Sequence, residues 1–344
     1  MSGSAGVGRS VGQDRRPRLD DVDRMKGMVI LLVVLGHVVA REPPAGHAWW
    51  DTLRTAIYAF HMPAFLYLGG LVMAHTGTLQ MPLYGYAQYV RRRAVRLLVP
   101  FFGLGLLVVT GKLALAPFLH VDNAPDGAAE ALVGLFWDTT RSPSLTIWYV
   151  LVAFVYAVTL PPLVHRSGGS VIPAVGLAIL LFALPIPPVA YADRVAGYAV
   201  FFTAGLLAGL SLQAWMALVD RHRRAFWALF ACSCLLVLLP VAPSVRLLVA
   251  GLLSMPALHA LARLPSVARF PLWAWLGRYA FVIYLLNTIA IGLMKALMLK
   301  VFGSWDGANF LLFAPILLLS GVLLPVLAKT VLFRRVPALN RLTD

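Results

Sequence analysis

The sequence predicts an all-α polytopic membrane protein. Its 344 residues are 60% hydrophobic and only 12% are charged, whereas ordinary soluble domains carry about 25% charged residues. The apolar runs are about 20 residues long, which suits helices that cross a hydrocarbon core of about 30 Å. Membrane β-strands would instead be about 10 residues long with alternating hydrophobicity, and the chain lacks that pattern.

The apolar runs predict about ten transmembrane helices. The expected spans cover residues 26–42, 54–75, 97–117, 146–164, 170–187, 195–215, 225–241, 244–262, 277–297 and 309–331. The first is short, and Lys26 is placed to snorkel at its inner end. Residues 80–96 are expected to form an amphipathic approach to the third span at the inner interface.

Basic residues predict the orientation of these spans. They gather in the two terminal tails and in every second loop, whereas the opposite loops, such as HVDNAPDGAAE and GSWDGAN, are acidic or mixed. The positive-inside rule then predicts that both termini are cytoplasmic and that the protein is integral to the cytoplasmic (inner) membrane. Topology also accounts for the net charge of +15, so nucleic acid is not expected as a partner.

Three parts are expected along the chain. Residues 1–20 form a disordered basic tail, residues 21–334 the transmembrane domain, and residues 335–344 a cytoplasmic tail. The first apolar run is expected to be a retained signal anchor. Cys232 and Cys234 lie one residue apart in an apolar run and are expected to pack as small residues. No metal site is expected, because the histidines lack clustered carboxylate or thiol partners.

Three polar side chains are predicted to meet near the middle of the membrane. The helical rise places His37 about 16 Å, His61 about 20 Å and Asn287 about 15 Å from the inner face. Histidines and asparagines in such positions also join helices by hydrogen bonds in a purely structural role. Two histidines at matched depth nevertheless favour function.

Basic and aromatic residues near the span ends have two interpretations each. Arg93 and Arg96 share a helix face, where they either set topology and touch anionic lipid or bind phosphate bidentately. Trp148 and Tyr149 begin the fourth span at its outer side. There they either anchor the helix at the interface or line a substrate entrance.

Several of these segments, in this order, resemble motifs of the membrane-bound acyltransferase family 3, which includes bacterial sugar O-acetyltransferases. The stretch VDRMKGMVILLVVLGH resembles the first-helix signature, with Asp23, Lys26 and His37 at the acidic, basic and histidine positions. Its Lys-Gly form is more similar to the fucose 4-O-acetylase branch. The segments FHMPAFLYLGG, RRRAVRLLVPFF, IWYVLVAF, YAVFFTAGLLAG and LGRYAFVIYLLN resemble the later motifs. Two positions depart from the pattern: Gly69-Gly70 stands where Ser-Gly is common, and Asn287 stands where the late motif usually ends in histidine.

The resemblance implies transfer of an acetyl or other short acyl group from cytoplasmic acyl-CoA to a hydroxyl of a glycan or lipid-linked saccharide, in contact with membrane lipid. Acetyl-CoA enters as the acyl donor, and no metal is implied. A sugar hydroxyl needs a positioned base, and an imidazole titrates near neutral pH. The residues expected to take part in catalysis are His37, His61 and Asn287. The residues expected to bind the CoA phosphates are Lys26, Arg93 and Arg96, and Asp23 is expected to orient Lys26. The residues expected to contact the substrate are Trp148, Tyr149 and Tyr284.

Two other classes of function remain open on the sequence. A transporter or flippase would use buried histidines to move protons or an acidic solute, although the chain shows neither repeated halves nor many acidic residues within its spans. A non-catalytic relative would only bind acyl-CoA or glycan, and Asn287 in place of histidine keeps that reading open. Turnover of acyl-CoA with and without an acceptor separates the three.

Overall fold

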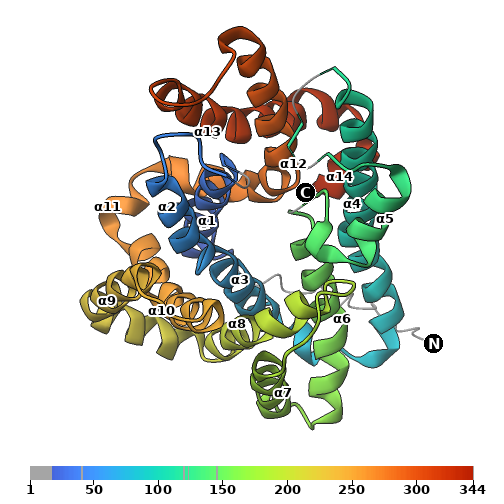
Figure 1. Ribbon diagram of the computed structural model, residues 1–344. Coiled ribbons are helices and arrows are strands. Elements are labelled where there is room, and N and C mark those ends of the chain that lie inside the picture. Colours follow the sequence, from blue (N-terminus) through green and yellow to red (C-terminus); the bar gives the residue numbers. More distant parts are fainter. Residues whose placement is uncertain (1–17, 40–41, 119–120, 123, 145, 344) are drawn as a thin grey trace, which may run out of the picture.

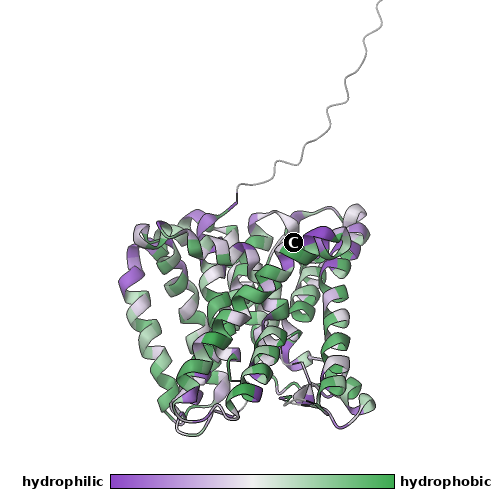
Figure 2. Ribbon diagram, turned by 90° about the horizontal axis from the view of Figure 1, so that it is seen from above, coloured by the Kyte–Doolittle hydropathy of each residue, from purple (hydrophilic) through white to green (hydrophobic). Residues whose placement is uncertain are grey.

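The computed structural model describes residues 18–39, 42–118, 121–122, 124–144 and 146–343, and every regular element within these ranges is helical. Hydrophobic residues cover the body of the bundle, and hydrophilic residues gather towards its two ends (Figure 2). The all-α class predicted from the sequence is therefore confirmed. Of the predicted tail at residues 1–20, residues 1–17 lie outside the described residues, and Asp20 already begins the first helix.

Fourteen α-helices follow one another along the described chain. They are α1 (Asp20–His37), α2 (Trp49–Tyr58), α3 (His61–His75), α4 (Tyr86–Leu115), α5 (Ala128–Phe136), α6 (Trp148–Arg166), α7 (Ile172–Ala183), α8 (Ala192–Leu210), α9 (Leu212–Cys234), α10 (Pro243–Arg263), α11 (Pro265–Ala268), α12 (Pro271–Phe302), α13 (Asn309–Leu327) and α14 (Pro337–Thr343). Single turns of other helix types cover Thr78–Gln80, Leu83–Gly85, Thr139–Arg141, Leu235–Leu238, Ala328–Leu332 and Phe333–Arg335. In the bundle, α1 packs against α12, α3 against α8, and α12 against α13 (Figure 1).

Six helical segments of the described chain are long and apolar enough to cross a membrane, or up to seven if the pair α8–α9, bent by 103°, forms one span. Each of the ten predicted spans overlaps a helix. However, α1 begins with three acidic residues and α7 has only 12 residues, so neither meets the same standard. The count of ten stays a prediction. The predicted approach at residues 80–96 merges into α4, which continues through Pro100.

Both ends of the described chain lie at the same end of the bundle, here called the termini end (Figure 2). At this end Arg263 donates hydrogen bonds to Asp21 at 2.8 Å and to Asp220 at 2.6 Å. Arg334, near the end of the chain, approaches the Tyr279 hydroxyl at 3.3 Å. This arrangement agrees with an even number of crossings. The cytoplasmic location of the termini end stays a prediction.

Two glycines bring α1 and α12 into close contact. A Cβ added to Gly27 would lie 2.0 Å from the Trp273 carbonyl oxygen, and one added to Gly277 would lie 1.9 Å from that of Asp23. Small residues allow the backbones of membrane helices to approach in this way. His37 and Asn287 each lie ten residues after one of these glycines. Because both helices begin at the termini end, the glycine contact sets the register in which these two side chains meet.

Gly277→Ala is expected to destabilise the bundle, because the added methyl group has no space against the backbone of α1. Overpacking of this kind typically costs about 1–3 kcal/mol. The melting temperature in detergent should fall accordingly. The matched control is Gly292→Ala on the same helix, where nothing lies within 4 Å of the added Cβ. Equal melting temperatures for the native protein and Gly277→Ala would show that the contact is looser than described.

Candidate functional site

A cavity of about 350 Å³ opens among the helices at His37 and His61. Its wall also includes Tyr58, Trp148, Tyr198, Tyr284, Arg194 and Arg246, which come from α2, α6, α8, α10 and α12. The helices α8 and α10 begin at this cavity and end at the termini end, where Gly209 packs on α3 and Arg263 pairs with Asp21. The cavity therefore faces the opposite end of the bundle.

His37 is the last residue of α1 and is held by Asn287 of α12. Its Nδ1 lies 2.8 Å from Asn287 Oδ1. The amide nitrogen of Asn287 donates to the carbonyl oxygens of Ile283 at 2.9 Å and Tyr284 at 2.8 Å. Both amide protons are thus used within α12, and the oxygen faces the imidazole.

This hydrogen-bond pattern determines which nitrogen of His37 carries the proton. An amide oxygen only accepts hydrogen bonds, so Nδ1 of His37 must be the donor. In the neutral imidazole Nε2 then keeps its lone pair, which is the state that a general base requires. The structure brings His37 and Asn287 together, as their depths predict, whereas their catalytic roles stay predictions.

His61 lines the same cavity, but its side chain is hydrogen-bonded to the backbone of the preceding helical turn. It begins α3 after a break at Ala59–Phe60, and its Nδ1 donates to the Ile57 carbonyl oxygen at 2.8 Å. Pro63 explains the break, because its ring cannot pack against the carbonyl of the residue four positions earlier. With Nδ1 protonated, Nε2 of His61 is an acceptor.

Tyr58 separates the two histidines. Its ring centroid lies 5.1 Å from that of His61 and 6.4 Å from that of His37. Its hydroxyl donates to the Gly36 carbonyl oxygen at 3.0 Å, which ties α2 to the end of α1. Among the described contacts, the histidines make no direct hydrogen bond to each other.

The predicted aromatic residues lie at different depths of the site. Trp148 lines the cavity and packs against Tyr198, with ring centroids 4.8 Å apart. Tyr149 is not in the cavity wall and instead packs on Tyr284 with a centroid distance of 5.2 Å. Tyr284 is in the wall, is only 4% exposed, and its hydroxyl makes no hydrogen bond to another described residue. A buried unpaired hydroxyl costs about 1–3 kcal/mol, so this one indicates a place for a ligand.

The predicted phosphate cluster is only partly assembled at the termini end. Asp23 forms an ion pair with Arg18 and lies 3.5 Å from the Lys26 ammonium. Arg96 lies over the Phe281 ring of α12, 5.8 Å from its centroid, and acts electrostatically on Lys26. Arg93 instead packs over Tyr89 of its own helix at 5.2 Å. The two arginines thus make different contacts despite their shared spacing.

A second cavity of about 350 Å³ also borders His37. Its lining is mainly apolar and comes from α4 and α12, including Leu107, Leu115 and Leu293. At its edge Lys295 donates a hydrogen bond to the Asp122 carboxylate at 2.8 Å. The His37 imidazole therefore lies between a polar cavity and an apolar one.

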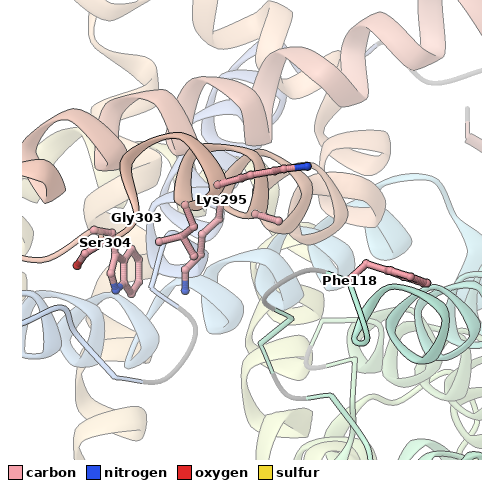
Figure 3. A pocket seen from close by; sticks show the side chains of 8 residues that line it. Phe118, Lys295, Gly303 and Ser304 are labelled. Carbon is pink, nitrogen blue, oxygen red and sulfur yellow. The ribbon is translucent and has the colours of Figure 1, made fainter.

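A third cavity, about 470 Å³, lies near the end of α12 and lacks both histidines. Figure 3 shows Lys295, Gly303 and Ser304 on one side of it and Phe118 across from them. The Lys295 ammonium also lies 3.7 Å from the centroid of the Trp305 ring, in addition to its ion pair. The described lining also includes Lys300 but no histidine or carboxylate, so this cavity offers no general base comparable to His37.

Sequence reasoning missed four residues near the site: Tyr58, Arg194, Arg246 and Lys295. Lys295 carried a usable signal, since a lysine inside the apolar run IGLMKALML is costly and marks function or a partner. Arg194 and Arg246 carried a weaker signal, because both follow loops that the sequence predicts to face away from the cytoplasm, where arginine is disfavoured.

The fold and this cavity define a multi-pass helical membrane protein with a histidine-centred site. The acyltransferase-3 family, described as an acyltransferase domain, matches residues 19–330. The chain therefore belongs to this acyltransferase family. It is also similar to the nodulation protein NolL of Sinorhizobium fredii, with 34% identity over 139 residues that cover 38% of this chain and 34% of that protein. No solved structure gives a significant match.

Proposed function

We propose that this protein is a membrane O-acyltransferase that moves an acetyl or other short acyl group from acyl-CoA to a saccharide hydroxyl in the cavity at His37. The observation that carries the proposal is the His37–Asn287 pair, 2.8 Å apart, which directs the basic Nε2 of a half-buried imidazole away from its partner. Membership of the acyltransferase family supports the reaction class. The acyl-CoA donor and the saccharide acceptor are proposed from the resemblance of the sequence motifs to this family.

The reaction follows from the positions of the protons. Nε2 of His37 takes the proton of the acceptor hydroxyl as its oxygen bonds to the thioester carbonyl carbon. The carbon–sulfur bond then breaks, and the proton passes from the imidazole to the leaving CoA sulfur. Tyr284 has a free hydroxyl proton for the developing oxyanion. His61 presents an acceptor nitrogen, so it suits orientation of the acceptor better than stabilisation of the oxyanion.

We propose that the donor binds from the termini end, that this end faces the cytoplasm, and that the protein lies in the cytoplasmic membrane. The positive charges of Lys26 and Arg96 repel each other there, and a bound phosphate group offsets such repulsion. His37 lies about 16 Å further along α1, a distance that the extended pantetheine arm spans. The apolar cavity beside His37 suits a hydrocarbon chain, either of the acyl group or of a lipid-linked acceptor.

Arg96→Ala is expected to weaken acetyl-CoA binding about tenfold or more, because hydrogen bonds to charged groups contribute about 1.5–3 kcal/mol. The matched variant is Arg93→Ala, which removes the same charge from the same helix. It should have a smaller effect, since its guanidinium packs on Tyr89. Binding and release of CoA are measured with the purified protein in detergent. Absence of acetyl-CoA binding by the native protein would refute the proposed function.

A further inference from the structure

Two arginines line the polar cavity at the end opposite the termini. Arg194 lies in the first turn of α8, and Arg246 lies in the first turn of α10. They are the formally charged residues in the described cavity wall, which includes no carboxylate. The wall therefore carries a positive charge close to the two histidines.

The position of both arginines is unfavourable without an anionic partner. The N-terminal end of a helix carries partial positive charge, so a cation in the first turn is repelled. The first turn of α10 has no acidic residue. The Arg246 side chain is half-buried and makes no hydrogen bond or ion pair with another described residue. Arg194 has Asp193 at 3.3 Å. The positive-inside rule also disfavours arginine at this end of the bundle.

A second observation points independently to a ligand in the same cavity. The Tyr284 hydroxyl is buried, lies in the wall and makes no hydrogen bond within the described chain. Beside it, Trp148 and Tyr198 form an aromatic surface, and the Arg194 guanidinium carbon lies 5.5 Å from the Trp148 ring centroid. The volume of about 350 Å³ falls in the range of small-molecule sites. An aromatic surface suits the apolar face of a sugar ring, and a guanidinium binds paired anionic oxygens bidentately.

We propose that the acceptor is an anionic saccharide whose carboxylate or phosphate is bound by Arg194 and Arg246. Its ring packs on Trp148, and the hydroxyl that is acylated reaches Nε2 of His37. This inference rests on the proposed function and adds the class of acceptor to it. The carboxylate of a uronic acid and the phosphate of a sugar phosphate share the chemistry that these arginines recognise.

The test uses the full-length protein in nanodiscs and direct binding of three probes. These are phenyl β-glucuronide, its uncharged methyl ester, and glucose 1-phosphate, each titrated by calorimetry. The native protein is expected to bind at least one charged probe about tenfold or more tightly than the ester, in line with a charge-assisted bidentate contact. Arg246→Gln and Arg194→Gln should each reduce that preference. The matched control is Arg141→Gln, since Arg141 is exposed, lies in the turn next to the start of α8 and pairs with Asp138.

The outcomes separate this inference from the proposed function. Equal affinity for charged and neutral probes, or no binding of either charged probe, would overturn the inference. If the native protein still releases CoA from acetyl-CoA in that case, the acyltransferase proposal survives alone. If a charged probe binds through Arg246 but no CoA is ever released, the anionic site stands and the transfer proposal fails.

Two further arms identify the source of the anion. Tighter binding of glucose 1-phosphate than of the glucuronide supports a phosphate-bearing acceptor, and the reverse order supports a uronic acid. Nanodiscs with and without phosphatidylglycerol test the lipid headgroup. If Arg246→Gln changes only the retention of phosphatidylglycerol and leaves saccharide binding unchanged, the arginines hold lipid and the inference is wrong.

Discussion

His37→Ala is expected to abolish acyl transfer while leaving the helical bundle folded. A positioned general base contributes about 10²–10⁴-fold to the rate. Among the described residues of the polar cavity wall, His37 and His61 are the two histidines. The His37 side chain borders two cavities rather than the packed core, so its truncation removes one hydrogen bond to Asn287. The measurement is CoA release from acetyl-CoA by the purified variant, with and without acceptor.

Two controls separate chemistry from folding and binding in this experiment. His37→Ala should still bind acetyl-CoA, because the proposed phosphate contacts lie at the termini end of α1. Its melting temperature should fall only modestly, since the Asn287 oxygen left unpaired costs about 1–3 kcal/mol. His61→Ala is the matched histidine variant and should lose less activity. Transfer by His37→Ala at a near-native rate would exclude this histidine as the base.

The meeting of His37 and Asn287 was predictable because helix rise is constant. Counting residues from the inner face gives both side chains nearly the same depth. Equal depth does not by itself bring the two helices into contact. The close approach at Gly27 and Gly277 does so, and it holds α1 and α12 in one register. The rotation of each helix about its axis was not predictable. The sequence therefore did not show that the amide of Asn287 is oriented by the carbonyls of its own helix.

Other histidines show the limit of that reasoning. His259 of α10 is also fully buried, yet it lies against the Tyr67 hydroxyl at 2.7 Å, and its Nε2 is 3.5 Å from the Asp21 carboxylate. It lines none of the described cavities, so a buried histidine by itself does not mark the site. His61 lines the same cavity as His37, but its hydrogen bond depends on a helix break that hydropathy does not report.

The number of crossings was harder to predict than the fold class. Hydropathy reports the composition and length of an apolar run. The number of membrane crossings also depends on where the helices bend, which hydropathy does not report. The α8–α9 pair turns by 103° although its two apolar runs look like separate spans in the sequence. Hydropathy underestimates α1, the helix that carries His37. Its acidic first turn lowers its mean hydropathy, although the helix packs closely against α12. The acidic residues of this turn form ion pairs: Asp23 pairs with Arg18 and Lys26, and Asp21 pairs with Arg263.

Asn287→Leu is expected to lower kcat by about 100-fold with little change in KM for acetyl-CoA. Leucine has nearly the same size but cannot accept the proton of His37 Nδ1, so the imidazole loses the interaction that keeps Nε2 unprotonated. In serine protease triads, an incorrect histidine tautomer costs up to about 10⁴-fold in kcat. Asn287→Leu removes only the preference for a proton on Nδ1 of His37, so its cost should be smaller. Steady-state kinetics with varied acetyl-CoA separates kcat from KM.

Asn287→Asp is the variant that distinguishes positioning from packing. A carboxyl group also accepts from Nδ1 of His37, and in its neutral form it can donate to the carbonyl of Ile283 or Tyr284 as the amide does. It should therefore keep kcat within about tenfold of the native value, whereas leucine should not. If both variants lose the same activity, Asn287 matters through packing between α1 and α12. If neither loses activity, His37 does not depend on a fixed tautomer, and the asparagine is only a link between two helices.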